Sequence, residues 1–561
     1  MKITGSKAII QSLIHEGVDT IFGYPGGAIM PAYDALYDFR HQIRHVLVRH
    51  EQGAAHAAEG YARATGKPAV CIATSGPGAT NLITGIADAQ MDSIPVVFIT
   101  GQVAKPLLGT DAFQETDVMG VTMPVTKWNY QITEAAEIPL IIAKAFYIAR
   151  SGRPGPVVID ITKDAQLGML DWEYSKVDSL PSYNPVLEPS QAALTEAAEI
   201  INSAKRPLML VGHGVLIAGA EEELKLFTEK TGAPVALTLH GLSAIPMAHP
   251  NVVGMLGMHG HYAPNMLTNE ADVIIAVGMR FDDRVTGNLK TYARNAQIIH
   301  IDIDAAEIDK NVISTVAIVA DAKVALSELL TLVEEKNPQE WRERFSRLRE
   351  EEQKQVISAE VSPQSGKIRM GEVIALLSEL TDGEAVIVAD VGQNQMMSAR
   401  YYNFKQPNSY ITSGGLGTMG YALPAAMGVK IALPDREVVA VCGDGGFQMN
   451  IQELATVAQE RLPLKVLLLN NSYLGMVRQW QEMFNEERYS CVDLVNPDFM
   501  KLADGFGLDS ARVTSREELR AGLEAMIKSE RGFVLEVVVE KQGKVFPMVP
   551  AGACVSDVRL S

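Results

Sequence analysis

The sequence predicts an α/β protein with three doubly wound parallel-sheet domains. The chain has 561 residues, too many for one hydrophobic core, and at roughly 150 residues per domain three domains are expected. Short β-branched runs alternate with helical patterns throughout, as in parallel sheets with crossover helices. Most of these runs end near glycine or a small polar residue.

The first predicted domain covers residues 1–165. It opens with an amphipathic pattern, MKITGSKAIIQSLIHEGVDTIF, that predicts a helix leading into a strand. Further strands are predicted in DTIFGYPGG, AVCIATSGPG, IPVVFITG and GPVVIDIT. Residues 179–190, SLPSYNPVLEPS, have the proline and serine content of a linker.

The second predicted domain covers residues 190–345, with strands in RPLMLVGHG, APVALTLHG, DVIIAVGMRF and AQIIHIDID. A charged run at 333–355 predicts a helix with a solvated face and a connection to the next domain. The third domain covers 366–540, with strands in EAVIVADVG, EVVAVCGDGG and LKVLLLNN, and a tail follows at 541–561. The first and third domains have a similar size and a similar spacing of predicted strands and helices, which suggests that they are related.

Composition limits the classes of partner. The chain is 47% hydrophobic and carries a net charge of −18, which argues against nucleic acid and against anionic membranes as main partners. Its four cysteines are widely spaced, without a C-x-x-C pair, which favours a reducing compartment. No signal-peptide pattern is present, and no window approaches the ~18 apolar residues of a membrane span. We therefore expect a soluble cytoplasmic protein, or one whose targeting segment is absent from this sequence.

An acidic residue, Asp444, lies between glycines directly after an apolar run. Such a turn normally brings backbone N–H groups to an anion, where a carboxylate would repel it. The next predicted strand ends in Asn470 and Asn471, so both stretches can reach one edge of a parallel sheet. Carboxylate and amide oxygens suit Mg²⁺ or Ca²⁺, and Mg²⁺ commonly shares its ligand shell with phosphates. A lone GDG is usually a turn, but this combination predicts a metal ion that holds a diphosphate.

The combination resembles the thiamine diphosphate (ThDP) motif. The resemblance implies that Asp444, Asn471 and the backbone oxygen of Tyr473 hold Mg²⁺ against the cofactor. A ThDP enzyme also needs a desolvated carboxyl group beside the aminopyrimidine ring, because protonating this ring prepares the cofactor to lose its C2 proton. Glu51 follows an apolar strand and opens a helix of small residues. By position alone, a glutamate here more often stabilises the start of the helix than serves as a catalytic acid.

The segment HEQGAAHAAEGYARATG resembles the pyrimidine-binding domain of the superfamily, which implies that Glu51 is the cofactor acid. His50 and His56 are expected to be structural.

The similarity to one family of ThDP enzymes extends over almost the whole chain. The segments YPGGAIMPAYDAL, TSGPGATN, GTDAFQE, RPGPVVIDITKD, LGMHG, RFDDRVTGN, GGLGTMGYALPAA and GMVRQWQ occur in the order seen in acetohydroxyacid synthase (acetolactate synthase) catalytic subunits.

This resemblance implies the ThDP-binding fold: a pyrimidine domain, a central FAD domain and a diphosphate domain. It also implies a reaction in branched-chain amino acid biosynthesis. The family decarboxylates pyruvate and joins the two-carbon unit to a second pyruvate, giving 2-acetolactate, or to 2-oxobutanoate, giving 2-aceto-2-hydroxybutyrate. The chain has no adjacent His-His pair of the kind that simple decarboxylases share, which favours carboligation.

Site residues follow from the matching positions. The active-site set implied beside Glu51 is Gly27, Phe113, Gln114, Lys163, Met419 and Trp480. Taken alone, Phe113 and Trp480 would more often be core aromatics, and Lys163 a surface amine. The resemblance instead implies that Trp480 shapes a pocket that favours 2-oxobutanoate and that Lys163 lies at the substrate channel. The remaining ThDP contacts implied are Val391, Gly392, Gln393, Gly417, Gly443, Gly445, Gly446, Gly475 and Met476.

The middle domain resembles the FAD domain of the family, although GHGVLI (212–217) lacks the third glycine of a GxGxxG motif. Arginines suit the pyrophosphate of the flavin and Asp302 suits a ribose hydroxyl. The implied FAD contacts are Arg153, Gly212, His213, Gly214, Thr238, Leu239, His240, Gly257, Met258, His259, Gly278, Arg280, Asp282, Arg284, Asp302, Ile303 and Asp321. In this family FAD is mainly structural, since the net reaction transfers no electrons.

Four positions depart from the family pattern. Asn394 stands where histidine is usual, and an amide cannot carry a proton near neutrality. The diphosphate loop reads GDGGF in place of GDASF, and Ala104 replaces a proline near the channel that inhibitors occupy. None of these changes removes a catalytic element.

Three other functions remain open at this point. They are an FAD-dependent pyruvate oxidase, an inactive ThDP-fold regulatory paralogue and a flavoprotein used only for binding. RFDDRVTGN and GMVRQWQ argue against the oxidase, and Glu51, Asp444 and Asn471 argue against an inactive protein. The resemblance further implies a homo-oligomer, a dimer or tetramer, with the active site between the first domain of one subunit and the third of another. A small regulatory subunit is a further implied partner.

Overall fold

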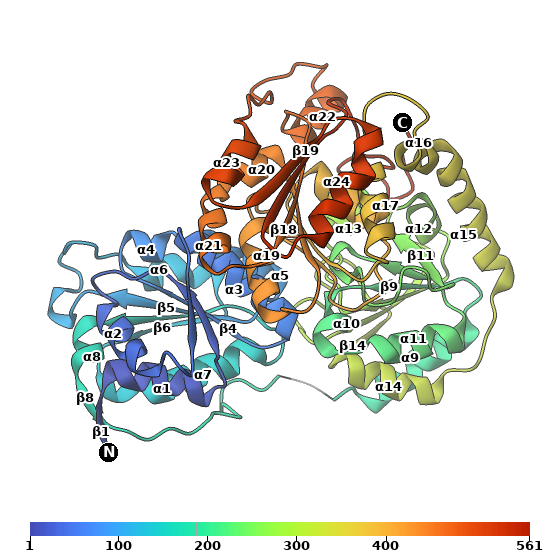
Figure 1. The fold of residues 1–561 in the computed structure, drawn as a ribbon. Helices are drawn as coiled ribbons and strands as arrows, with labels where there is room; N and C mark the ends of the chain where they lie inside the picture. The colour runs from blue at the N-terminus through green and yellow to red at the C-terminus, as the bar shows by residue number, and fades with distance from the viewer. Residues whose placement is uncertain (186–187) are drawn as a thin grey trace.

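The computed structural model describes every residue except 186 and 187, which fall within the predicted 179–190 linker and lie outside the described residues. The described chain contains three six-stranded sheets with helices on their faces (Figure 1). Every strand pair in these sheets is parallel. The predicted class, α/β with three parallel-sheet domains, is therefore confirmed.

The first sheet has the strand order β3-β2-β4-β5-β7-β6. Its strands are β2 (Thr20–Gly23), β3 (Arg44–Leu47), β4 (Ala69–Ala73), β5 (Val96–Gln102), β6 (Trp128–Ile132) and β7 (Val157–Thr162). Its helices are α1 (Gly5–His15), α2 (Met30–Phe39), α3 (Glu51–Thr65), α4 (Pro77–Thr80), α5 (Ile83–Asp92), α6 (Val118–Thr122), α7 (Ile138–Arg150) and α8 (Lys163–Leu167). A short antiparallel pair, β1 (Lys2–Thr4) with β8 (Met169–Asp171), joins the two ends of this part of the chain.

The second sheet has the order β11-β10-β9-β12-β13-β14. Its strands are β9 (Pro207–Val211), β10 (Val235–Leu237), β11 (Val252–Met255), β12 (Val273–Val277), β13 (Gln297–Asp302) and β14 (Val316–Val319). Its helices are α9 (Gln191–Ser203), α10 (His213–Ala218), α11 (Glu221–Thr231), α12 (Tyr262–Thr268), α13 (Asp283–Thr286) and α14 (Ala322–Leu332).

The charged run forms the connection to the third sheet. It contains α15 (Gln339–Glu352), a π-helical turn at Gln353–Ile357 and α16 (Ser358–Val361). One face of α15 is solvated, as predicted, but the other packs on the second sheet through the buried Trp341, whose indole N–H donates to the carbonyl of Pro207 at 2.8 Å. Among all described residues, none belongs to a helix with the length and apolarity that a membrane crossing requires.

The third sheet has the order β16-β15-β17-β18-β20-β19. Its strands are β15 (Val386–Ala389), β16 (Tyr410–Thr412), β17 (Val438–Gly443), β18 (Lys465–Asn470), β19 (Asp509–Val513) and β20 (Phe533–Val538). Its helices are α17 (Met370–Leu380), α18 (Gln393–Tyr401), α19 (Ala422–Ala432), α20 (Asp444–Met449), α21 (Leu454–Gln459), α22 (Gly475–Phe484), α23 (Phe499–Gly505) and α24 (Arg516–Lys528). When each sheet is numbered from its own first strand, β2 or β15, both have the order 2-1-3-4-6-5. This shared order explains the similar spacing of strands and helices in the two sequences.

The first and third domains meet through α3 and α19, which pack at very short range (Figure 1). Both helices carry glycine at the contact. A Cβ atom added at Gly428 would overlap the carbonyl oxygen of Ala57, and one added at Gly60 would overlap that of Ala425. The two helix backbones therefore touch directly, and they fix the edges of the two sheets relative to one another.

Replacing Gly428 by alanine is expected to lower the midpoint of thermal unfolding, because α3 and α19 must move apart to admit the methyl group. Overpacking of this kind costs about 1–3 kcal/mol. Differential scanning calorimetry would measure the change against Gly505→Ala, a helical glycine whose added Cβ meets nothing within 4 Å. Equal midpoints for the two variants would contradict the direct contact between the helices.

Candidate functional site

A small cavity lies at the carboxyl edge of the third sheet, where β15, β17 and β18 end. Three helices start there: α18 at Gln393, α20 at Asp444 and α22 at Gly475. The lining includes Asn394 and most of the predicted ThDP residues, namely Val391, Gly392, Gln393, Met419, Gly443, Asp444, Gly445, Gly446, Asn471, Tyr473, Gly475 and Met476. Helix N-termini carry a partial positive charge, so three of them at one cavity favour an anionic group.

The oxygen atoms at this cavity fit a hard divalent cation. Asp444 is buried, and burial raises the pKa of its carboxyl group against the opposing hydrogen bond from Asn496, whose Nδ2 donates at 2.7 Å. Asn471 offers its amide oxygen, which accepts from the backbone N–H of Tyr473 at 3.1 Å. A cation between these oxygens would favour the charged form of Asp444, so the donor set suits Mg²⁺.

Glycine forms the floor of this cavity. Gly392 has a φ of 140°, and an added Cβ at Gly475 would overlap Oε1 of Gln393. The cavity volume is about 60 Å³, enough for an ion and part of a phosphate group but not for a whole ThDP molecule. The remainder of a bound ThDP would therefore extend beyond the cavity.

Asn394 and Asp390 hold the backbone at this edge of the sheet through hydrogen bonds. Nδ2 of Asn394 donates to the carbonyl oxygens of Asp390 and Val441, at 2.7 and 3.1 Å, and so ties β15 to β17. The Asp390 carboxylate accepts from the backbone N–H groups of Val391 and Gly420, while burial raises its pKa to about 6. The sequence interpretation missed Asp390, although an acidic residue directly after an apolar strand is the same signal that identified Asp444.

Glu51 lies at the carboxyl edge of the first sheet, as the first residue of α3. Nδ2 of Asn81 donates to its Oε2 at 2.9 Å, and an added Cβ at Gly78 would lie 3.3 Å from Oε1. Its side chain is half-buried in the single chain. The two neighbouring histidines have local partners: His50 accepts from the N–H of Gln52 at 3.1 Å, and His56 contacts Glu59 at 2.9 Å.

The other predicted residues of the first domain gather at the same edge. Gly27 follows β2, and Gln114, with a φ of 61°, packs against Gly76. Phe113 is 88% exposed, so it is not a core aromatic, and Lys163 is exposed at the start of α8. Among the described residues, the lining of the Asp444 cavity includes neither Glu51 nor any of these four.

Two predicted residues of the third domain lie beside the cavity without lining it. Gly417 belongs to the turn after β16 and has a φ of 76°. Trp480 is half-buried on α22, where its ring packs edge-on against Phe484 with the centroids 5.6 Å apart. Within the described chain, the Asp444 cavity and the Glu51 edge are therefore formed by different sets of residues.

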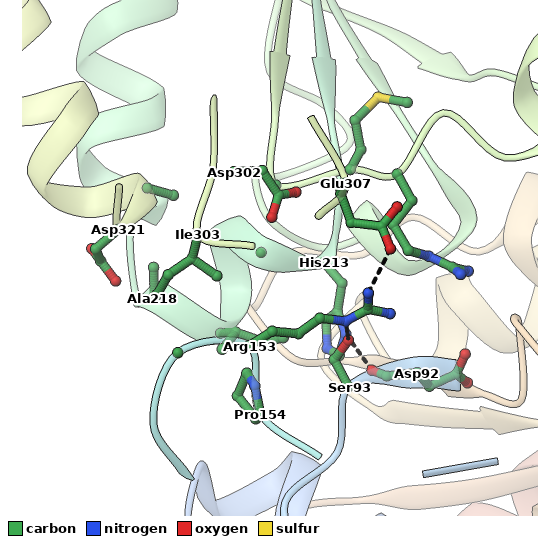
Figure 2. A pocket seen from close by; sticks show the side chains of 18 of the residues that line it. Asp92, Ser93, Arg153, Pro154, His213, Ala218, Asp302, Ile303, Glu307 and Asp321 are labelled. Atoms are coloured by element: carbon green, nitrogen blue, oxygen red, sulfur yellow. Dashed lines mark hydrogen bonds and ion pairs between the residues drawn. The ribbon is translucent and has the colours of Figure 1, made fainter. Parts of the chain in front are cut away.

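A larger cavity, of about 470 Å³, lies at the carboxyl ends of the second sheet (Figure 2). Counted from β9, the strand order is 3-2-1-4-5-6, so the order reverses between β9 and β12. Dinucleotides bind in the crevice at such a reversal. The predicted FAD residues that line it are Arg153, Gly212, His213, Gly214, Thr238, Gly278, Arg280, Asp282, Asp302, Ile303 and Asp321.

The shape and chemistry of this cavity fit a dinucleotide. Added Cβ atoms at Gly212 and Gly214 would contact the backbone of Gly278, so glycine here lets α10 begin close to the sheet. Asp302 ends β13 facing the cavity, and burial raises its pKa to about 6 (Figure 2). Arg153 reaches in from the first domain, held by Oγ of Ser93 at 2.8 Å and Oε1 of Glu307 at 2.7 Å.

The remaining predicted FAD residues lie next to this cavity. Gly257, Met258 and Arg284 line a smaller adjoining space with residues 549–552, and Leu239 directly follows Thr238. His259 is buried, and its carbonyl oxygen accepts from Arg400 at 3.1 Å. The sequence interpretation included His240, through the TLH segment, but missed other lining residues, among them Asp92, Ser93 and Glu307. No local pattern marks Asp92 or Ser93, because the fold alone brings them from the first domain to the second.

Comparisons with known proteins agree with this arrangement. Family models of thiamine pyrophosphate enzymes match the N-terminal binding domain at residues 3–121, the central domain at 194–329 and the C-terminal binding domain at 390–537. The acetolactate synthase large subunit of Corynebacterium glutamicum is 47% identical, over 100% of this chain and 90% of that protein. The isozyme 2 large subunit of Escherichia coli is 46% identical over 99% of both chains, and the large subunit of Lactococcus lactis is 46% identical over 98% and 95%.

Proposed function

The chain belongs to the acetolactate synthase large-subunit family of thiamine pyrophosphate enzymes, and we propose that its active site combines Glu51 of one copy with the Asp444 cavity of a second. The observation that carries this proposal is the separation of the two half-sites within the chain. Neither is complete alone, since a ThDP enzyme needs both a diphosphate site and a carboxyl group at the pyrimidine ring.

Asp444, Asn471 and the backbone oxygen of Tyr473 would hold Mg²⁺, and the N-termini of α18, α20 and α22 would bind the diphosphate. When bound, ThDP supplies an electron sink for the negative charge that remains after pyruvate loses CO₂. Glu51 would hold a proton at the pyrimidine ring nitrogen, with its Oε2 oriented by Asn81.

The second keto acid would enter beside Trp480 and Lys163. Trp480 would shape the pocket for the acceptor and favour 2-oxobutanoate over pyruvate, while Phe113 and Gln114 would exclude water from it. The products proposed are 2-acetolactate and 2-aceto-2-hydroxybutyrate, which serve valine, leucine and isoleucine synthesis.

Exposed apolar side chains of the first and third domains support a homo-oligomer. Phe113 is 88% exposed, Met123 67%, Met449 58% and Val495 100%. Contiguous exposed apolar surface commonly marks an interface between subunits. The relative in Escherichia coli is named as a large subunit, and by extension we also propose a small regulatory partner for this chain.

The cavity of the second sheet is proposed to bind FAD. Arg153 and Arg280 would meet the pyrophosphate, and Asp302 would accept from a ribose hydroxyl. FAD would serve as a structural cofactor there, because the condensation transfers no electrons. The four cysteines are free, which supports the cytoplasm as the proposed location.

Incubation with pyruvate, ThDP, Mg²⁺ and FAD, without an added electron acceptor, tests this function. We expect two pyruvates consumed and one CO₂ released for each 2-acetolactate formed, measured by gas analysis and by chromatography of the product. Acetate together with reduced flavin would identify an oxidase instead, and acetaldehyde a simple decarboxylase. Absence of turnover with all cofactors bound would contradict the proposed composite site in a homo-oligomer.

A further inference from the structure

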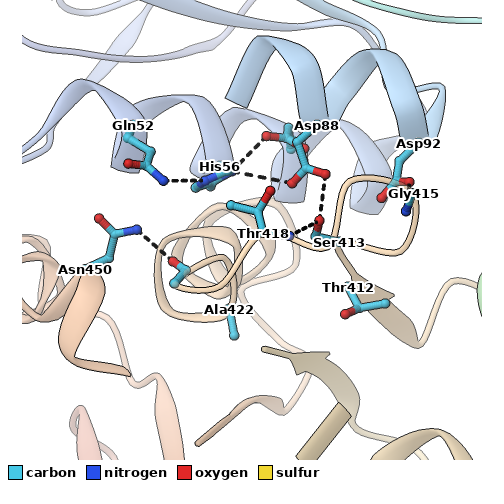
Figure 3. A network of polar contacts seen from close by, with 12 residues as sticks. Gln52, His56, Asp88, Asp92, Thr412, Ser413, Gly415, Thr418, Ala422 and Asn450 are labelled. Carbon is cyan, nitrogen blue, oxygen red and sulfur yellow. Dashed lines mark hydrogen bonds and ion pairs between the residues drawn. The ribbon is translucent and has the colours of Figure 1, made fainter. Parts of the chain in front are cut away.

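Asp92, the last residue of α5, lies where the three domains meet. Its side chain is buried, and its neighbours come from all three. Figure 3 shows Ser413 and Gly415 of the third domain beside α5 of the first, and His240 of the second domain contacts the Asp92 carboxylate. Asp92 also lines the cavity of the second sheet, and its own carbonyl oxygen lies 3.2 Å from Nδ1 of His213 (Figure 2). Because the residue after it, Ser93, holds Arg153, this end of α5 forms part of the wall of the proposed flavin site.

The carboxylate of Asp92 points away from that cavity, to the turn at 413–419. Its Oδ2 accepts from the N–H of Gly414 at 2.9 Å, and its Oδ1 accepts from that of Gly415 at 2.7 Å. This turn continues to Gly417 and Met419, the residues proposed to contact the pyrimidine ring. The backbone of the turn is therefore anchored by a side chain of the flavin site.

His240 makes a second connection between the two sites. It lines the flavin cavity, where its ring stacks on that of His213 with the centroids 5.4 Å apart. Its Nε2 lies 3.0 Å from Oδ1 of Asp92, and a Cβ added at Gly414 would overlap its ring. A displacement of His240 would therefore be transmitted to both Asp92 and the turn.

The charges around Asp92 keep its carboxylate ionised. Burial acts to raise its pKa, but His240 and then Arg63 outweigh that effect and hold the pKa below the ordinary value. Arg63 also donates to the carbonyl oxygen of Thr412 at 2.8 Å and lies 3.2 Å from Nδ1 of His240. Charged groups in a low-dielectric junction favour one arrangement strongly, because any separation of the partners is costly.

We propose that Asp92 is a positioning residue that couples the two cofactor sites. An occupied flavin cavity fixes His213 and His240, these fix Asp92, and Asp92 holds the 413–419 turn ready for the pyrimidine ring. This inference rests on the proposed function and deepens it, since it gives a flavin that transfers no electrons a defined effect on ThDP binding.

The test measures the dissociation constant of ThDP, at saturating Mg²⁺, for flavin-free and FAD-saturated protein by isothermal titration calorimetry. Couplings of this kind change affinity by a factor of roughly 5 to 150. We expect FAD to tighten ThDP binding within this range in the unaltered protein. In Asp92→Asn, which keeps the shape but loses the charge and one backbone acceptor, the factor should fall to near one.

Asp88 provides the matched control. It lies one turn earlier on α5, is equally buried, and accepts from Oγ of Ser413 in the same turn at 2.7 Å (Figure 3). Unlike Asp92, it is not among the described residues that line the flavin cavity. Asp88→Asn is therefore expected to weaken ThDP binding by the same factor with and without FAD, and so to keep the coupling.

His240→Asn gives an independent test should Asp92→Asn fail to fold, and it is expected to lose the coupling as well. A coupling in these variants equal to that of the unaltered protein would overturn the inference. Independent binding of the two cofactors by the unaltered protein would overturn it while the proposed function stands. If the unaltered protein bound neither cofactor, both proposals would fail.

Discussion

Replacing Glu51 by glutamine is expected to slow 2-acetolactate formation by a factor of about 10²–10⁴, the usual contribution of a positioned acid or base. Glutamine keeps the size of the side chain and an oxygen that can accept from Asn81, but it cannot exchange a proton with the pyrimidine ring. The loss should therefore appear in kcat, while KM for pyruvate changes little.

Two measurements separate this chemical effect from damage to the fold. Hydrogen–deuterium exchange at C2 of bound ThDP, followed by NMR, should slow together with turnover. Glu379→Gln serves as the control, because Glu379 is an exposed glutamate that pairs with Arg520 on the outer side of the third domain. A Glu51→Gln variant that retained more than a tenth of the activity would rule out this residue as the cofactor acid.

Replacing Asp444 by alanine is expected to weaken Mg²⁺-dependent ThDP binding more than 100-fold, since loss of an outer-shell partner alone typically costs about 10–100-fold. Without the carboxylate, none of the described residues that line the cavity would offer the metal a negatively charged side chain, and the diphosphate would lose the cation that links it to the protein. Equilibrium dialysis of ThDP over a range of Mg²⁺ concentrations would measure the loss.

Asn496→Ala supplies the graded comparison. Its amide donates to Asp444 but does not line the cavity, so its removal should weaken binding by about 10–100-fold. The expected order is therefore unaltered protein, Asn496→Ala and then Asp444→Ala. Equal affinity of Asp444→Ala and the unaltered protein would exclude a metal-bridged diphosphate at this edge.

The two inactive variants together test the composite site. In a mixed dimer of Glu51→Gln and Asp444→Ala chains, one site combines both changes and the other combines two unaltered half-sites. Random reassociation of equal amounts should therefore restore about a quarter of full activity, because half the dimers are mixed and each has one intact site. If each chain contained a complete site of its own, mixing would restore nothing.

The strands that the sequence predicted are those with the strongest apolar patterns. In all three sheets these were mostly central strands, such as β4, β9 and β17, whose side chains are buried on both faces. Most of the strands it missed lie at sheet edges: β6, β11, β14, β16 and β19. An edge strand pairs on one side only, and a half-buried example such as β6 carries a mixed polar sequence. β20, which is buried beside β18, was missed although its sequence FVLEVV is apolar at five of its six positions.

Some residues of the candidate site could be identified from the sequence and others only from the structure. Residues within contiguous motifs, such as Asp444 and Glu51, could be identified because their neighbours in sequence are also their neighbours in space. Asp92 could not, because its partners lie in other domains and only the folded chain brings them together. Asp390 was within reach of the sequence, since it follows a buried strand as Asp444 does.

Because the first and third domains share one strand order, the positions of Glu51 and Asp444 in their sheets can be compared directly. Asp444 follows the third strand of its sheet, whereas the equivalent turn of the first domain carries Ser75 and Gly76, without a carboxylate. Glu51 follows the second strand of its sheet, where the third domain has the 413–419 turn. The proposed two-fold dimer would therefore contain four sheet edges of the same strand order, two bearing the acid and two bearing the metal ligands. Pairing unlike edges would give two reaction centres, and neither kind of edge would have to serve both purposes.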